Sequence, residues 1–127
     1  MMGRFYGICI MILCMISCAP NEEVISKEKC LEYMHELGIV DQVTNEAIDT
    51  PMRDSLTRII FEHGKFRRGK FLLDVSRDYF IEQGLPSIAY DVVIFNVWEI
   101  NTTLKDMDKD VRKDFEKIFI SEQSLLF

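Results

Sequence analysis

The stretch that decides the fold of this 127-residue chain is SIAYDVVIFNVWEINTTL, residues 87–104. Its middle, from Val92 to Trp98, is rich in β-branched and aromatic residues, a composition typical of a strand. The chain holds no second run of this kind, and a lone strand could not satisfy its backbone hydrogen-bonding groups. The apolar residues from Ile88 to Phe119 also recur at steps of three or four, which is helical spacing. We therefore predict one long helix, continuous or broken near Asn101-Thr102-Thr103, with other helices packed on several of its sides.

Upstream of this stretch, capping residues mark where further helices begin and end. Ser26 suits the N-cap of a first helix, which Gly38 either ends or weakens. Thr50-Pro51 suits the start of a second helix, because Thr can cap and Pro fits the first helical position, and Gly64 is its expected end. A third helix is expected to bury Phe71, Leu72, Val75, Tyr79 and Phe80 and to end at Gly84-Leu85-Pro86. The predicted fold is all-α, a small bundle of four to five helices with a long C-terminal helix.

The N-terminal segment has the pattern of a secretory signal. A single charge, Arg4, precedes the apolar run from Phe5 to Ile16, and Pro20 and the acids after it close the run before it could span a bilayer. Ser17-Cys18 resembles the lipobox of bacterial lipoproteins, although Met15 stands where Leu is usual. The expected organisation is a lipoprotein signal peptide at 1–17, a lipidated cysteine and linker at 18–25, and a helical domain at 26–127. The alternatives are an ordinary secreted protein cut nearby and an uncleaved anchor.

The lipobox resemblance implies where the chain is held. It implies a diacylglyceryl group on the Cys18 thiol and cleavage that makes Cys18 the first residue, and more than one acyl chain gives stable membrane attachment. Ala19, rather than Asp, follows the cysteine, which by analogy with lipoprotein sorting favours the outer membrane. The periplasmic face and the cell surface both stay open. No cofactor is expected other than these covalent acyl chains.

Composition narrows the function further. The formal net charge is −6, so the chain as a whole has no electrostatic reason to bind nucleic acid or an anionic bilayer surface. Of its four cysteines, Cys9 and Cys14 lie in the signal and Cys18 is the lipidation site, so no disulfide can form within the mature domain. We expect the remaining Cys30 to be a core residue on an apolar helix face; a reactive thiol is the alternative.

Several short motifs, taken in order, resemble a family of short Bacteroidota lipoproteins that carry a helical domain of unknown function. The resemblance covers about residues 18 to 104, and the matching stretches are 23–29 running into Leu37, Phe61-Glu62-His63-Gly64, Phe71, Ser76-Arg77-Asp78-Tyr79-Phe80 and Tyr90-Asp91-Val92-Val93. This sequence departs from the pattern at Arg67-Arg68-Gly69, which replaces a polar cap, and at Phe80, where tyrosine is common. The resemblance implies a fold and a cellular location, but it implies no activity.

No catalytic or metal-binding set stands out in the sequence. Glu32 and His35 have the Glu-x-x-His spacing of di-metal bundles, but those sites need two such motifs and two more glutamates. His63, just before Gly64, suits the last turn of a helix, where the helix dipole favours a cation. The Ser76/Tyr79 pair is expected to pack rather than to react. We therefore predict no metal site and a protein that is not an enzyme.

One basic cluster stands out in this acidic sequence, and Arg77 follows nearby. The residues of this cluster are the candidate contact residues: Lys65, Phe66, Arg67, Arg68 and Lys70. They could meet lipid phosphates or an acidic partner, with Phe66 inserted between them; the alternative is a solvated connection between helices. We predict a lipid-anchored accessory or binding subunit of an outer-membrane assembly, with a protein partner in the envelope and no nucleic acid. The alternative is an immunity or exclusion lipoprotein that neutralises a toxin or phage, for which a basic effector is the expected target.

Overall fold

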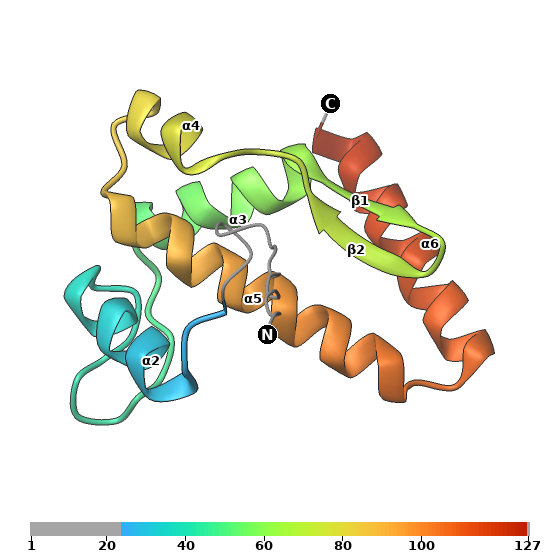
Figure 1. Ribbon diagram of the computed structural model, residues 1–127, viewed down its shortest axis with the longest axis horizontal. Helices are drawn as coiled ribbons and strands as arrows, with labels where there is room; N and C mark the ends of the chain where they lie inside the picture. Colours follow the sequence, from blue (N-terminus) through green and yellow to red (C-terminus); the bar gives the residue numbers. More distant parts are fainter. Residues whose placement is uncertain (1–23, 127) are drawn as a thin grey trace, which may run out of the picture.

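The computed structural model describes residues 24–126. The predictions for the signal peptide, for Cys18 and for most of the linker fall outside this range. In chain order the elements are α2 (Lys27–Glu36), α3 (Pro51–His63), β1 (Gly64–Arg67), β2 (Lys70–Leu73), α4 (Arg77–Glu82), α5 (Ser87–Asp106) and α6 (Lys109–Leu126). The predominantly helical prediction is confirmed, but all-α is wrong, because β1 and β2 form a two-stranded antiparallel sheet (Figure 1).

The predicted helix starts are confirmed by their caps. The Ser26 hydroxyl accepts a hydrogen bond from the Lys29 amide at 3.1 Å and starts α2. The Thr50 hydroxyl accepts one from the Arg53 amide at 3.1 Å, with Pro51 in the first helical position of α3. Gly38 lies just after the end of α2 with a φ of 73°, so it ends that helix rather than weakening it.

The central element is α5, and Val92–Trp98 is helical within it, as predicted. Its first half is buried on several sides by α2, α3 and α4, while β2 packs on its second half. The buried residues of this half are Ala89, Tyr90, Val92, Val93 and Phe95. This arrangement explains a strand-like composition in a helix, since β-branched and aromatic side chains fill a core that surrounds the element.

The long C-terminal helix is broken, but not near residues 101–103. The break lies at Met107 and Asp108, between α5 and α6. Met107 is extended, with a ψ of 147°, and an Asp108 carboxylate oxygen accepts a hydrogen bond from the Asp110 amide at 3.2 Å. An aspartate that caps the next helix therefore fixes the break, whereas Asn101 faces the hairpin.

The connection predicted at 65–70 and the third helix predicted from Phe71 are both wrong. Residues 64–73 form a hairpin in which Phe66 pairs with Phe71 and Arg67 with Lys70. The two turn residues, Arg68 and Gly69, have φ values of 55° and 79°. Positive φ at both positions is typical of a type I′ turn, whose twist matches that of the two strands. The following helix, α4, starts only at Arg77.

Two clusters make up the core of the described residues. The larger surrounds the first half of α5 and includes Cys30, Leu56 and Phe80. The smaller is built on Phe71, Leu104 and Phe119. In it, Phe66 is in contact with Phe71, Phe115 and Phe119, with ring centroids 5.2, 5.9 and 5.5 Å apart. The ring contacts of this aromatic cluster hold the hairpin against α6 and so position the turn at Arg68.

Candidate functional site

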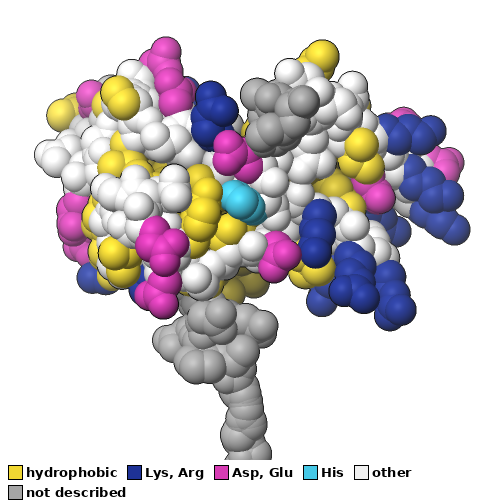
Figure 2. All heavy atoms as spheres, turned by 90° about the horizontal axis from the view of Figure 1, so that it is seen from above, with side chains coloured by type: hydrophobic (Ala, Val, Ile, Leu, Met, Phe, Trp, Pro, Cys, Tyr) yellow, Lys and Arg dark blue, Asp and Glu magenta, His cyan; other side chains and the backbone are white. Residues whose placement is uncertain are grey.

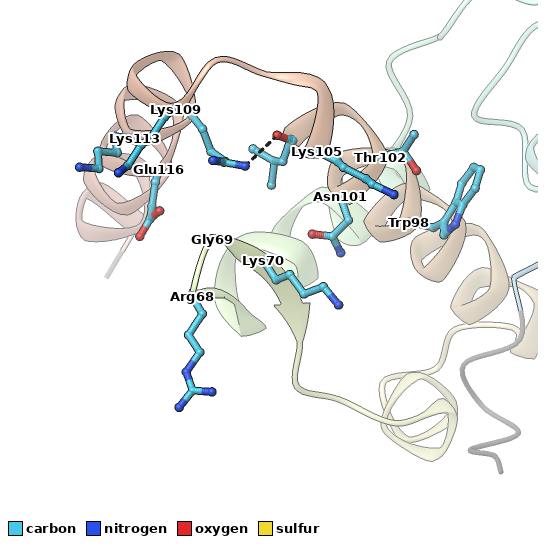
Figure 3. A pocket seen from close by; sticks show the side chains of 12 residues that line it. Arg68, Gly69, Lys70, Trp98, Asn101, Thr102, Lys105, Lys109, Lys113 and Glu116 are labelled. Atoms are coloured by element: carbon cyan, nitrogen blue, oxygen red, sulfur yellow. Dashed lines mark hydrogen bonds between the residues drawn. The ribbon is translucent and has the colours of Figure 1, made fainter. Parts of the chain in front are cut away.

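A cleft of about 690 Å³ opens between the hairpin turn, the second half of α5 and the first half of α6 (Figure 3). We call it the basic cleft. It is lined by Arg68, Gly69, Lys70, Trp98, Asn101, Thr102, Leu104, Lys105, Lys109, Arg112, Lys113 and Glu116. Segments up to 48 positions apart in the sequence meet here, so the folded chain brings together cations that are separate in the sequence.

An amide side chain of α5, Asn101, ties the hairpin wall to that helix. The Asn101 Oδ1 atom accepts a hydrogen bond from the Phe71 amide at 2.8 Å, and its Nδ2 atom donates one to the Phe71 carbonyl, also at 2.8 Å. Asn101 thus satisfies both backbone groups of Phe71 at the outer edge of β2, as a neighbouring strand would. These two bonds tie the hairpin to α5 and set the width of the cleft.

The opposite wall is set by lysines four residues apart. Lys105 lies near the end of α5, and Lys109 and Lys113 follow in α6. Residues four apart lie on one face of a helix, and the short break at Met107 and Asp108 keeps them on the cleft side. Arg112 donates to the Leu104 carbonyl at 3.4 Å, a carbonyl in the last turn of α5. This contact helps to hold α6 against the end of α5.

The electrostatics of the cleft differ from those of the whole chain. Six cationic side chains and one acid, Glu116, line it, although the chain carries −6 overall. Within residues 24–126, the Lys and Arg residues that form ion pairs lie elsewhere, at Lys29, Arg58, Lys65 and Arg77. On the face that Figure 2 shows, most of the basic side chains lie toward one end of the molecule. The cleft therefore presents a concentrated positive field that the described residues do not neutralise.

Arg68 reaches this cleft from a backbone conformation that arginine rarely adopts. Its φ of 55° lies in the left-handed region, where Gly, Asn and Asp are the usual residues. A side chain other than these costs of order 1 kcal/mol there. The hairpin would fold more easily with asparagine at this position, so folding alone does not account for the arginine.

The predicted contact residues are only partly brought together. Arg68 and Lys70 line the basic cleft. Lys65 lies 3.6 Å from an Asp74 carboxylate oxygen, and Phe66 belongs to the aromatic cluster rather than standing free between cations. Arg67 is exposed but does not line the cleft. Arg77, on α4, makes a two-pronged ion pair with Asp91 at 2.8 and 3.1 Å, which raises its pKa and ties α4 to α5.

Four cations that complete the cleft were not predicted from the sequence: Lys105, Lys109, Arg112 and Lys113. The four-residue spacing of the lysines was visible in KDMDKDVRK, residues 105–113. The aspartates at 106 and 110 each follow a lysine directly, so the segment reads as a mixed, solvated face. Only the position of the hairpin distinguishes the lysine side of the helix from the aspartate side.

Each of the two histidines lies within hydrogen-bond distance of a neighbouring side chain. The Nε2 atom of His35 lies 3.0 Å from the Asn45 side-chain oxygen, and that of His63 lies 3.0 Å from the Tyr79 hydroxyl, in the last turn of α3 as predicted. The Ser76 hydroxyl accepts from the Tyr79 amide at 3.4 Å and caps α4. In the part of the chain that the structure describes, no group of three or more His, Cys, Asp and Glu side chains is arranged to hold a metal ion.

Cys30 is a core residue, as expected, with 1% of its surface exposed. Burial, with a smaller contribution from the negative charge of Glu99, raises the pKa of its thiol to about 11. A thiol that stays protonated and buried is a poor nucleophile. The alternative of a reactive cysteine therefore has no support in the geometry.

No helix between residues 24 and 126 combines the length and the apolar character needed to cross a membrane. Comparison of the chain with protein-family models, characterised proteins and solved structures yields no match. The resemblance to Bacteroidota lipoproteins therefore stays a prediction, and the basic cleft is the feature of the structure that points to a function.

Proposed function

We propose that this chain is a lipid-anchored protein of the outer membrane that acts by binding rather than by catalysis. In this proposal it is an accessory subunit of an envelope assembly, held through acyl chains on Cys18, and the basic cleft is its contact site for an anionic partner. The observation that carries the proposal is the set of six cations in one cleft without ion pairs among the described residues, in a chain of net charge −6. The strained backbone of Arg68 at the same site supports it.

The anchor is tested by membrane fractionation of cells that produce the chain with a C-terminal tag. The Cys18→Ala variant should leave the membrane fraction, because the acyl chains supply most of the attachment. Intact mass measurement of the unchanged chain should show the added acyl groups. A Cys18→Ala chain that stays in the membrane would contradict the lipoprotein assignment.

The binding site is tested by crosslinking in intact cells, followed by purification through the tag. A triple variant, Lys105→Gln, Lys109→Gln and Lys113→Gln, should lose the crosslinked partner. A matched control, Lys29→Gln, Arg53→Gln and Arg58→Gln, removes the same charge from exposed positions outside the basic cleft and should keep it. Equal recovery of the partner from both variants would refute the cleft as the contact site for that partner.

The immunity or exclusion function is a second proposal, favoured by the acidic surface outside the cleft. For this function we expect a basic effector that binds outside the basic cleft, away from its six cations. Recovery of such an effector, undiminished in the lysine variant and weakened by salt, would favour this function over an accessory subunit.

A further inference from the structure

The start of the described chain lies beside the basic cleft. Val24, Ile25, Phe95, Trp98 and Glu99 are among the residues that line a second hollow, of about 450 Å³. Trp98 lines both this hollow and the basic cleft. The point at which the linker joins the domain and the cationic surface are therefore on adjoining parts of the molecule.

Chain length limits how far this region can stand from an anchor at Cys18. Six residue steps separate Cys18 from Val24, and a fully extended chain advances ~3.3–3.6 Å per residue, so the reach is at most about 22 Å. A domain held this closely turns the surface around Val24 toward the lipid that holds the anchor. Trp98 and the adjoining end of the basic cleft belong to that surface.

Trp98 has the properties of a residue at a membrane interface. Its side chain is large and aromatic, yet the residue is 44% exposed. The centroid of its ring lies 5.7 Å from the centroid of the Phe95 ring. Indole rings favour the headgroup region, since they are apolar over most of their surface and carry one N–H donor. Lysines and arginines near such a ring can reach the phosphate groups of the lipids.

The acids of the same segment do not cancel this attraction. Asp106, Asp110 and Asp114 each follow a lysine directly and so lie about 100° further round the helix. They do not line the cleft, whereas Glu116 does. The lining of the cleft therefore stays cationic, with Glu116 as its one acid.

We infer that Trp98 and the basic cleft form a membrane-docking surface that binds the phosphate groups of anionic lipids in the membrane that holds the anchor. The inference rests on the proposed anchor and names the anionic partner of the cleft. It favours lipid over an acidic protein, because the short linker and the exposed indole point to the bilayer and a protein partner would require neither.

The single tryptophan of the chain makes the test specific, because all indole fluorescence comes from Trp98. The full lipidated chain is reconstituted into phosphatidylcholine vesicles, with and without phosphatidylglycerol, after its acyl groups have been verified by intact mass. Phosphatidylglycerol should shift Trp98 emission to shorter wavelength, and brominated phosphatidylglycerol should quench it. The Lys105, Lys109 and Lys113→Gln variant should reduce the docked-to-undocked ratio at least ~10-fold, and the Lys29, Arg53 and Arg58→Gln control should not.

The outcomes separate the docking surface from the anchor. Absence of acyl groups on Cys18 would overturn the proposed anchor and this inference together. Acylated protein whose Trp98 emission is the same in both kinds of vesicle, and is not quenched by brominated phosphatidylglycerol, would overturn the inference alone. The inference would also be overturned if the lysine variant docked on the vesicles as well as the control variant does. It would likewise be overturned if the lysines were required only for crosslinking to an acidic protein. Circular dichroism of both variants, and Arg68→Asn as a second cleft variant, exclude misfolding as the cause of a loss.

Discussion

Asn101 connects the hairpin to the central helix, and its replacement by alanine should destabilise the domain strongly. Both Asn101 contacts with Phe71 are 2.8 Å long, and Phe71 is 1% exposed, so water cannot readily replace them. Leaving a buried donor or acceptor unpaired costs about 1–3 kcal/mol, so the two groups together predict a loss of about 2–6 kcal/mol. A domain of this size has a stability of about 5–15 kcal/mol, so the effect is large.

Urea unfolding of Asn101→Ala measures this loss, and amide hydrogen exchange locates it. With a slope of ~1–3 kcal/mol per molar urea, the midpoint should fall by about 1–2 M, and exchange at the Phe71 amide should accelerate most. Thr102→Ala is the matched control: it changes an exposed neighbour in the same helix and should be neutral or slightly stabilising. A loss below ~0.5 kcal/mol, or a Phe71 amide that stays protected, would refute the role assigned to Asn101.

Three further changes test other parts of the structure. Gly64→Ala should destabilise by about 1–3 kcal/mol in thermal unfolding, since a Cβ there would overlap the Phe71 ring and the Ile60 carbonyl; an unchanged melting temperature would contradict this packing. Arg68→Asn should stabilise the domain by about 1 kcal/mol in urea because it relieves the left-handed strain, while weakening anion binding; a loss of stability would show that the turn is not strained. Burial raises the pKa of the Cys30 thiol to about 11, so the folded state holds this proton more tightly than the unfolded state does. The resulting contribution to the free energy of unfolding is fully present below about pH 9. It should be lost as the pH rises to about 11, at roughly 1.4 kcal/mol per pKa unit. The free energy of unfolding, measured across this pH range, should fall less steeply in Cys30→Ala than in the unchanged chain. Parallel pH profiles for the two proteins would argue against a raised Cys30 pKa.

The parts of the fold that the sequence predicted are those set by local chemistry. Ser26 and Thr50 cap helices because their hydroxyls accept amides three residues ahead, which is a property of adjacent positions. The helical state of Val92–Trp98 followed from the helical spacing of the apolar residues between Ile88 and Phe119. For Gly38 the sequence left two outcomes open, an end or a weakening of the helix, and its left-handed backbone shows that it ends the helix.

The hairpin could not be predicted in the same way. Its strands are four residues each, and its turn is Arg68-Gly69 rather than the Asn-Gly or Asp-Gly pair that is the strongest hairpin signal. Its stability also depends on contacts distant in sequence, since Asn101 lies 30 residues from Phe71. Phe66 and Phe71 are helix-compatible residues until Phe115 and Phe119 pack on them. Tertiary packing therefore decided the local structure.

The same non-local packing explains why net charge was a poor guide to binding. A value of −6 averages over the surface, whereas a ligand meets one cleft, where like charges gather without ion pairs among the described residues. Mutual repulsion of these cations raises the free energy of the folded state, and so does the strained backbone at Arg68. Packing explains neither feature, because Arg68, Lys70, Lys105, Lys109 and Lys113 are all exposed. An anionic partner would relieve the repulsion and would engage Arg68 directly. Two independent departures from the most stable arrangement thus meet in one cleft, which is the physical reason to assign the function there.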